Sequence, residues 1–414
     1  MPGMTMKSET NIKLPLSFII FGIIAFVVAQ STLFFGHDFI ANGQFRVPPI
    51  WSGSHFLLLG FAVMIAMGAM YQLVPVAFLT PIWNEKFGAV QFIVTALGIT
   101  SFAILLGVHA SYAIYGGAIA IIGILMFLFQ MLKTLQAQSK KNVMSYFVIG
   151  ALSALFLAII AGFTLAWNFS FTPFVSQDPM LFTHITLGVA GWFTLLIFGF
   201  SYKLVPMFSL SHGFSMKWAK PAFLTYVIGL VLLIGSYWLE THSIQTVGWI
   251  LLCGGFTFFG LDVREILTKR LRRKLDKPFA FAVFAIGIGF FVHLIAAILS
   301  IAQVKSPTVW SWVVFFYIMG WVIASILGYL YKIIPFLWWT YKYSERIGKE
   351  KVPTLKEMIN EKASVILFTL FIISIIGLTI GGLYSIGIVV FLFQGLLTIT
   401  SVLYAISVLK IFFI

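Results

Sequence analysis

Long apolar segments separated by short polar stretches run through the whole chain. Twelve of them are long enough to cross a bilayer core of roughly 30 Å, which takes about 20 helical residues. They lie near residues 14–35, 52–78, 88–111, 115–136, 143–167, 181–208, 219–239, 245–267, 278–303, 310–338, 363–384 and 387–411. This pattern predicts an all-α membrane protein with twelve transmembrane helices. The first segment is too long for a removable signal peptide, so we expect it to remain as a spanning helix.

One residue skeleton occurs three times, about 130 residues apart. In each copy, glycines stand fifteen and seven residues before a proline, and a tyrosine stands four residues before it. The copies are Gly60, Gly68, Tyr71 and Pro75; Gly191, Gly199, Tyr202 and Pro206; and Gly320, Gly328, Tyr331 and Pro335. A fixed period of this kind indicates internal repeats.

Four spans per copy predict three repeats, near 14–136, 143–267 and 278–411, within a single integral membrane domain of residues 1–414. We expect three arcs of four helices with pseudo-threefold symmetry. The glycines either let a neighbouring helix approach closely or leave space for a flat prosthetic group. The prolines are typical of helix terminators. The polar stretch 341–362 predicts a cytoplasmic connection with a short amphipathic helix near 354–362.

Composition and charge support the membrane assignment. Sixty-one per cent of the residues are hydrophobic and nine per cent are charged, with a mean hydropathy of +1.05. The formal charge of +14 could indicate a nucleic-acid surface, but with both termini inside only Arg46 and Lys305 of the 26 Lys and Arg fall outside. Such an asymmetry is typical of an inserted bundle. We therefore expect a multi-pass protein of a cell membrane, most simply the bacterial cytoplasmic membrane, and no nucleic-acid partner.

Most catalytic chemistry is excluded by missing motifs. The single cysteine, Cys253, rules out an internal disulfide and thiolate metal clusters. The sequence contains no Gly-rich phosphate loop and no His-Glu-x-x-His motif, and no acidic residue stands in the middle of a span. Soluble-type hydrolase and kinase functions are therefore excluded, and no catalytic residue is assigned.

Histidines are the remaining candidates. Of the seven, six are expected in the outer half of the membrane or beyond it, and only His212 on the cytoplasmic side. His55 and His184 lie within one helical turn of each other when the copies are superposed, whereas the third copy has Val313 and Phe315 at the matching positions. An imidazole inside lipid needs a partner, which is either a metal or haem iron, or a carbonyl or tyrosine.

The correspondence between repeats favours a shared functional role for His55 and His184. On a regular helix His184 shares a face with Gly188 and Gly191, which predicts a shallow trough where a macrocycle could lie. His109, at the end of the third span, and His293, deep in the ninth, are alternative ligands.

The architecture and the second helix of each arc resemble subunit I of the haem-copper oxidases. The stretch from His55 to Gly60 and on from Gly68 to Pro75 looks most like the second helix of the cbb-type and nitric-oxide-reductase-like branches, and is also similar to NnrS membrane proteins. The resemblance implies that His55 is an axial ligand of haem b. The family's tenth-helix and seventh-helix histidine pairs have no counterpart in 310–339 or 219–239, so a complete oxygen reductase is not expected.

We therefore predict a haem-binding membrane protein with His55 and His184 as iron ligands, copper as a second candidate cofactor, and Arg46 as a partner of the haem propionates. It would transfer electrons, bind a diatomic gas such as nitric oxide, or handle haem or copper. If it is an enzyme, it is a haem-dependent oxidoreductase. Its partners would be the lipid bilayer, haem and a further membrane subunit.

Two other functions fit the sequence. The first is a transporter of a metal ion or small solute, with the histidines in its pathway. The second is a cofactor-free assembly or scaffold subunit, in which aromatic side chains such as Phe315, Phe316 and Tyr317 fill the clefts.

Overall fold

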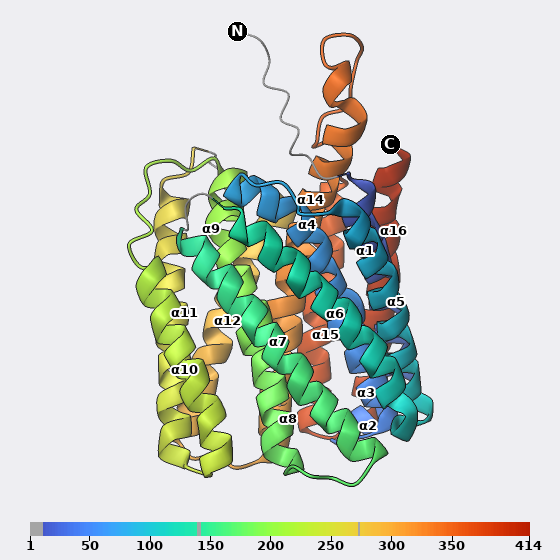
Figure 1. Cartoon of the computed structure of the whole chain (residues 1–414), viewed down its shortest axis with the longest axis vertical. Coiled ribbons are helices and arrows are strands. Elements are labelled where there is room, and N and C mark those ends of the chain that lie inside the picture. The colour runs from blue at the N-terminus through green and yellow to red at the C-terminus, as the bar shows by residue number, and fades with distance from the viewer. Residues whose placement is uncertain (1–10, 139–141, 272–273) are drawn as a thin grey trace. The chain divides into compact units, whose positions relative to one another are not determined.

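The computed structural model describes residues 11–138, 142–271 and 274–414, and within them the chain is almost entirely helical (Figure 1). Twelve helices are long and apolar enough to cross a membrane, one for each predicted span. They are Lys13–Phe35, Pro48–Phe78, Glu85–Val108, Ala110–Gln136, Val143–Ser170, Gln177–Ser209, Ala219–Leu239, His242–Thr268, Lys277–Ile301, Pro307–Arg346, Glu361–Leu383 and Gly387–Phe413. The prediction of a twelve-helix, multi-pass integral membrane protein is confirmed.

The helices group into two compact units. The first comprises residues 1–140 and 329–414 and the second residues 141–328. Helix α14 (Ala324–Tyr343) crosses the division, so the third predicted repeat contributes helices to both units. The prediction of a single domain stays a prediction.

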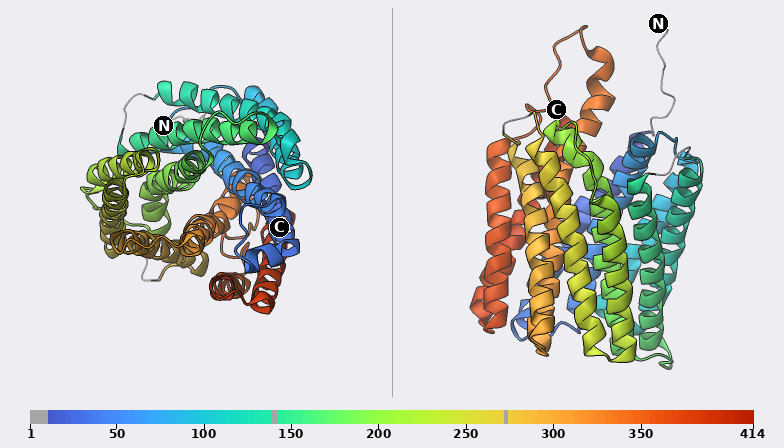
Figure 2. Two further views of the ribbon diagram at one scale, coloured as in Figure 1. Left: turned by 90° about the horizontal axis from the view of Figure 1, so that it is seen from below. Right: turned by 90° about the vertical axis from the view of Figure 1, so that its left-hand side faces the viewer.

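The first unit is built on α1, which contacts α4, α5 and α16. Its elements are α1 (Lys13–Phe35), α2 (His37–Ala41), α3 (Pro48–His55), η1 (Phe56–Val63), α4 (Met64–Phe78), α5 (Glu85–Val108), η2 (Ala110–Tyr112), α6 (Ala113–Gln136), the later part of α14, η5 (Ser344–Arg346), α15 (Glu361–Leu383), α16 (Gly387–Leu409) and η6 (Lys410–Phe413). The axes of its long helices are roughly aligned with one another (Figure 2).

In the second unit, α7 packs on α8 and α9, and α11 packs on α10 and α12. Its elements are α7 (Val143–Ser170), α8 (Gln177–Thr186), η3 (Leu187–Thr194), α9 (Leu195–Ser209), α10 (Ala219–Leu239), α11 (His242–Thr268), α12 (Lys277–Ile301), α13 (Pro307–Phe316), η4 (Tyr317–Ile323) and the first turn of α14. These helices too run alongside one another (Figure 2).

The repeated glycines serve close helix packing. A Cβ atom built at Gly60, Gly191 or Gly320 would stand 2.9, 2.7 or 2.9 Å from a side chain of the first helix of the same repeat, respectively α1, α7 and α12. The second glycine of each copy is equally tight, with Gly68 against Phe18 at 2.9 Å and Gly328 against Ala282 at 2.8 Å. Small residues at these points let two apolar helices approach, which is the main source of attraction between helices in lipid.

Each copy of the repeated helix also contains a π-helical segment, which the sequence did not predict. The segments η1, η3 and η4 begin three or four residues before the first glycine of their copy and end three residues after it. A π turn inserts one extra residue into an α-helix and often occurs at functional sites. The three-fold repeat is therefore visible in the backbone as well as in the sequence.

The repeated tyrosines anchor each copy to a later helix of its repeat. The hydroxyl groups of Tyr71, Tyr202 and Tyr331 donate to Gln91 Oε1 at 3.1 Å, Asp262 Oδ2 at 3.0 Å and Ser407 Oγ at 2.8 Å, respectively. Asp262 is a fully buried carboxylate near the inner end of α11 and also accepts the backbone N–H of Trp218 at 3.2 Å. Its two hydrogen bonds satisfy it without a cation.

Two local predictions are wrong. Pro335 does not end its helix, because α14 continues from it to Tyr343, whereas Pro75 and Pro206 lie three residues before the ends of α4 and α9. The amphipathic helix expected near 354–362 is a single turn instead, and α15 begins only at Glu361. In that turn Thr354 and Glu357 bond reciprocally, Thr354 N donating to Glu357 Oε2 at 2.7 Å. This reciprocal pair is a capping box at the start of the turn, but no helix continues from it.

Candidate functional site

His184 lies in α8, and its ring is fixed against the neighbouring helix α7. Its Nδ1 donates to the carbonyl oxygen of Ala158, 26 residues earlier in the chain, at 2.9 Å. The ring fits there because residue 162 has no side chain: a Cβ atom at Gly162 would stand 2.8 Å from His184 Cε1. Since a carbonyl oxygen can only accept, Nδ1 carries the proton and Nε2 carries the lone pair. This is the tautomer that binds a metal through Nε2.

His55 has the same tautomer, but the carbonyl oxygen that accepts its N–H belongs to its own helix. It is the last residue of α3, and its Nδ1 donates to the carbonyl oxygen of Trp51 in the same helix at 2.8 Å. The ring of Phe102 in α5 meets the imidazole edge-on, with 5.1 Å between ring centroids. His55 is therefore oriented by its own helix and an aromatic neighbour, and Nε2 is again the nitrogen with the lone pair.

The backbone beside His184 offers open space at one of the two predicted glycines. Nothing lies within 4 Å of a Cβ atom built at Gly188, four residues after the histidine. Gly191 instead packs on α7, where its Cβ atom would meet Ala154 at 2.7 Å. The π segment η3 begins between His184 and Gly191, so the regular helical spacing used in the sequence analysis does not hold. The trough is thus limited to Gly188.

His293 is completely buried in α12 and both ring nitrogens are engaged. Nδ1 donates to the carbonyl oxygen of Gly289 at 2.7 Å. Nε2 faces the hydroxyl groups of Tyr226 at 3.0 Å and Tyr317 at 3.1 Å. Because two tyrosines occupy the only lone pair of the ring, this arrangement does not present His293 to an iron atom.

The other two predicted residues lie near the surface of the first unit. His109 is exposed at the end of α5, with its ring against Tyr112. Arg46 is exposed in the connection between α2 and α3. His55, His109 and Arg46 thus belong to one unit, and His184 and His293 to the other.

Sequence reasoning missed Tyr226, Thr194 and Trp321 near His293, and it gave Tyr317 only a space-filling role. The hydroxyl of Tyr317 lies 2.8 Å from Thr194 Oγ1, and Trp321 Nε1 donates to the same oxygen at 3.1 Å. A polar residue inside a span was the available signal, since such residues must find partners in the bundle. It could not show which of them meet.

A copper site of the three-ligand type does not fit the described part of the chain. Within residues 11–138, 142–271 and 274–414, no group of three or more His, Cys, Asp or Glu side chains converges closely enough to hold a metal ion. A histidine acting alone can still serve as an axial ligand, since the four other bonds of haem iron come from the macrocycle.

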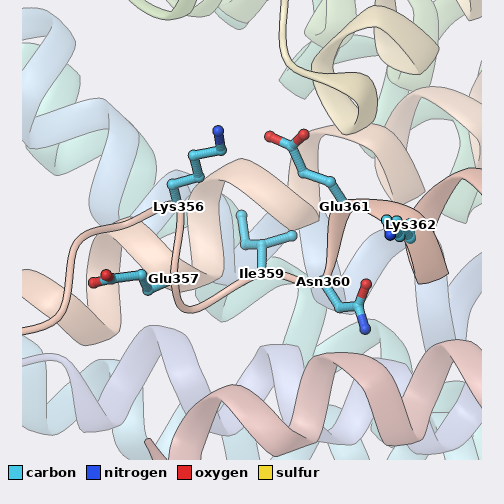
Figure 3. Close-up of a pocket in the computed structure, with 6 residues that line it drawn as sticks. All are labelled: Lys356, Glu357, Ile359, Asn360, Glu361 and Lys362. Carbon is cyan, nitrogen blue, oxygen red and sulfur yellow. The ribbon is translucent and has the colours of Figure 1, made fainter.

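A shallow hollow of about 490 Å³ lies in the first unit, where the 344–360 connection meets α15 (Figure 3). It is lined by Lys356, Glu357, Ile359, Asn360, Glu361 and Lys362. Lys356 and Glu361 point to one side, while Glu357 and Asn360 point elsewhere (Figure 3). Asn360 caps α15 by accepting the N–H of Ala363 at 3.0 Å. Charges of both signs that point apart, beside a neutral Asn360 that is used as a cap, do not form a ligand site.

Comparisons with known proteins give matches among solved structures. No protein-family model matches the sequence, and no curated protein matches it. Among solved structures, a haem-copper terminal oxidase determined as a dimer by cryo-electron microscopy is similar, with a TM-score of 0.73 and 11% identity. The match covers 97% of this chain and 84% of the oxidase chain. This chain therefore has the membrane fold of a haem-copper terminal oxidase.

Proposed function

We propose that this protein binds haem b in the bacterial cytoplasmic membrane and transfers electrons, with His55 and His184 as axial ligands. One observation carries the proposal. In a fold that resembles a haem-copper oxidase, two copies of the repeated helix hold an imidazole near the same position, each with Nδ1–H bound to a carbonyl oxygen. Such second-shell bonds orient the ring and raise the basicity of the ligating nitrogen.

The residues around His184 fit a flat apolar group. Gly188 leaves open space along the backbone, and a side chain there would fill it. When bound, haem supplies one-electron redox chemistry. The chain would hold the iron through Nε2, keep the ring in place through Ala158 and Gly162, and exclude water with its apolar helices. Arg46, in the same unit as His55, is the proposed partner of the propionates.

Electron transfer is the role we propose because the donor set is incomplete for oxygen reduction. His293 is engaged by two tyrosines, and the described side chains form no three-ligand group for copper. An imidazole ligand without a second metal would leave haem with one-electron redox chemistry.

An absorption spectrum of the detergent-purified protein tests the proposal. Protein made in a haem-replete host should show a Soret band when oxidised and an α band when reduced with dithionite. His55→Ala and His184→Ala should each lose most of this absorbance. His242→Ala is the matched control, since His242 Nε2 donates to Ser300 O at 2.9 Å and Nδ1 faces Gln245 at 3.3 Å, so that both ring nitrogens are engaged by the protein. Purified protein without a Soret band would contradict the proposal.

A further inference from the structure

A closed cluster of polar side chains lies in the interior of the second unit and contains neither of the proposed ligands. We call it the His293 cluster; it consists of Thr194 from η3, Tyr226 from α10, His293 from α12, and Tyr317 and Trp321 from η4. Tyr317 is 4% exposed and the other four are fully buried. Four elements thus meet through hydrogen bonds in an otherwise apolar bundle, where each unsatisfied polar group would be costly.

The cluster contains more short contacts than hydroxyl protons. The two tyrosine hydroxyls lie 3.0 and 3.1 Å from His293 Nε2 and 3.0 Å from each other. Tyr317 also meets Thr194 Oγ1 at 2.8 Å, and Thr194 meets the carbonyl oxygen of Val189 at 3.1 Å. These five contacts share only the three hydroxyl protons of Tyr226, Tyr317 and Thr194, because Nδ1–H of His293 is bound to Gly289. Two contacts therefore lack a proton when the imidazole is neutral.

One added proton lowers the deficit from two contacts to one, and that one can be covered by sharing. If Nε2 is protonated, its N–H is shared between the two tyrosine oxygens, as three-centre hydrogen bonds commonly are. Tyr226 then donates to Tyr317, Tyr317 to Thr194, and Thr194 to Val189 O. Every contact now carries a proton, and Trp321 still donates to Thr194. The hydroxyl groups can rotate between the two arrangements without any movement of the helices.

We propose that the His293 cluster is a proton-binding site, in which Nε2 of His293 takes up one proton and the two tyrosine oxygens accept the new N–H. The step adds a proton to the imidazole lone pair and breaks no bond. The site would hold a proton on a buried side chain inside the membrane. It contains neither proposed haem ligand, so it goes beyond the proposed function and does not rest on it.

Few titratable groups lie near His293. Among the described residues, α12 makes most of its contacts with α11, η4 and α13. His242 of α11 also meets α12, but at the carbonyl oxygen of Ser300, seven residues after His293. From α11 the neighbour of the ring is Phe256, with 4.6 Å between centroids. The titratable groups that face His293 are Tyr317 from η4 and, from α10, Tyr226. The buried carboxylate Asp262 is bound elsewhere, to Tyr202 and Trp218.

The test is a titration of the full-length protein in lipid nanodiscs, labelled with ¹⁵N-histidine and followed by solid-state NMR from about pH 9 to about pH 4. One signal, absent in His293→Gln, should change from neutral imidazole to imidazolium. Tyr226→Phe and Tyr317→Phe should each lower its midpoint by about one pH unit, because each removes an oxygen that accepts the new N–H.

Tyr237→Phe is the matched control, because Tyr237 is also a tyrosine of α10, half-buried, but its hydroxyl bonds Thr186 at 3.1 Å. It should leave the midpoint unchanged. If His293→Gln does not fold, the His293 signal is recognised as the one whose midpoint changes in Tyr226→Phe and Tyr317→Phe but not in Tyr237→Phe. The proposal is overturned if the His293 signal stays neutral throughout. It is equally overturned if the cluster tyrosines and Tyr237 have the same effect.

Discussion

His55 and His184 occupy related positions in two copies of one helix, yet the structure orients them differently. His55 bonds to a carbonyl oxygen of its own helix, four residues back. His184 bonds to a carbonyl oxygen of α7 and lies over a glycine that no other residue could replace without displacing the ring. The first arrangement needs only local sequence, whereas the second depends on how two helices pack. A repeat can therefore preserve a functional position while the support for that position changes.

Replacing each histidine separates the two kinds of support and should give the largest effects. Both His184→Ala and His55→Ala are expected to lower the haem content at least about tenfold. Only His184→Ala should also lower the free energy of unfolding, by about 1 kcal/mol, because it removes a bond between two helices. Haem content is measured by the pyridine haemochrome assay and stability by denaturant unfolding in detergent. Equal stability losses would contradict the distinction.

Gly162→Ala changes the surface of α7 on which the His184 ring lies and leaves the histidine itself in place. Its new methyl group would collide with the His184 ring, so the ring or α7 must shift at a cost of about 1 kcal/mol or more. Haem bound through His184 should then be released more readily. Gly235→Ala in α10 is the control, because nothing lies within 4 Å of its Cβ position. A Gly162→Ala protein with unchanged stability and haem content would show that the ring is not held as described.

Gly188→Leu tests whether the open space beside His184 is used. A Cβ atom there meets nothing within 4 Å, so we expect the fold to tolerate the substitution. Haem retention should fall about threefold, or roughly 0.7 kcal/mol, if a macrocycle occupies that space. Full retention of haem would place the macrocycle elsewhere. The measurement is haem titration of the apoprotein, followed at the Soret band.

Phe102→Leu should have the smallest effect, and only on the His55 copy. It removes an edge-on ring contact worth about 0.5–1 kcal/mol. The reduced α band should shift slightly or broaden as the His55 ring gains freedom. In a double variant, the effect of Phe102→Leu should add to that of Gly162→Ala. A loss of haem as large as that of His55→Ala would indicate that Phe102 has a further role.

The spans and the repeat could be predicted because both are written in single-residue patterns. The lengths of the apolar segments predicted all twelve helices. Close helix packing was one of the two expectations for the repeated glycines, and the structure shows it. The failures share a cause: they depend on contacts between segments. Ala158 supplies a carbonyl oxygen that leaves no mark on the sequence, and the meeting of Tyr226 with Tyr317 across 91 residues depends on the packing of α10 against η4. Pro335 failed for a local reason, since the apolar and aromatic residues after it keep α14 helical.

The π segments set the direction in which each histidine points. An additional residue within a helix advances everything that follows by about 100° around the axis. His184 lies three residues before such a segment, and Gly191 lies within it. Deleting a single residue from η3 would therefore rotate the imidazole away from Ala158 by more than a quarter of a circle, even though every side chain near it remained the same. The direction in which the proposed ligand points around its helix axis thus depends on the number of residues in η3 and not on which residues they are.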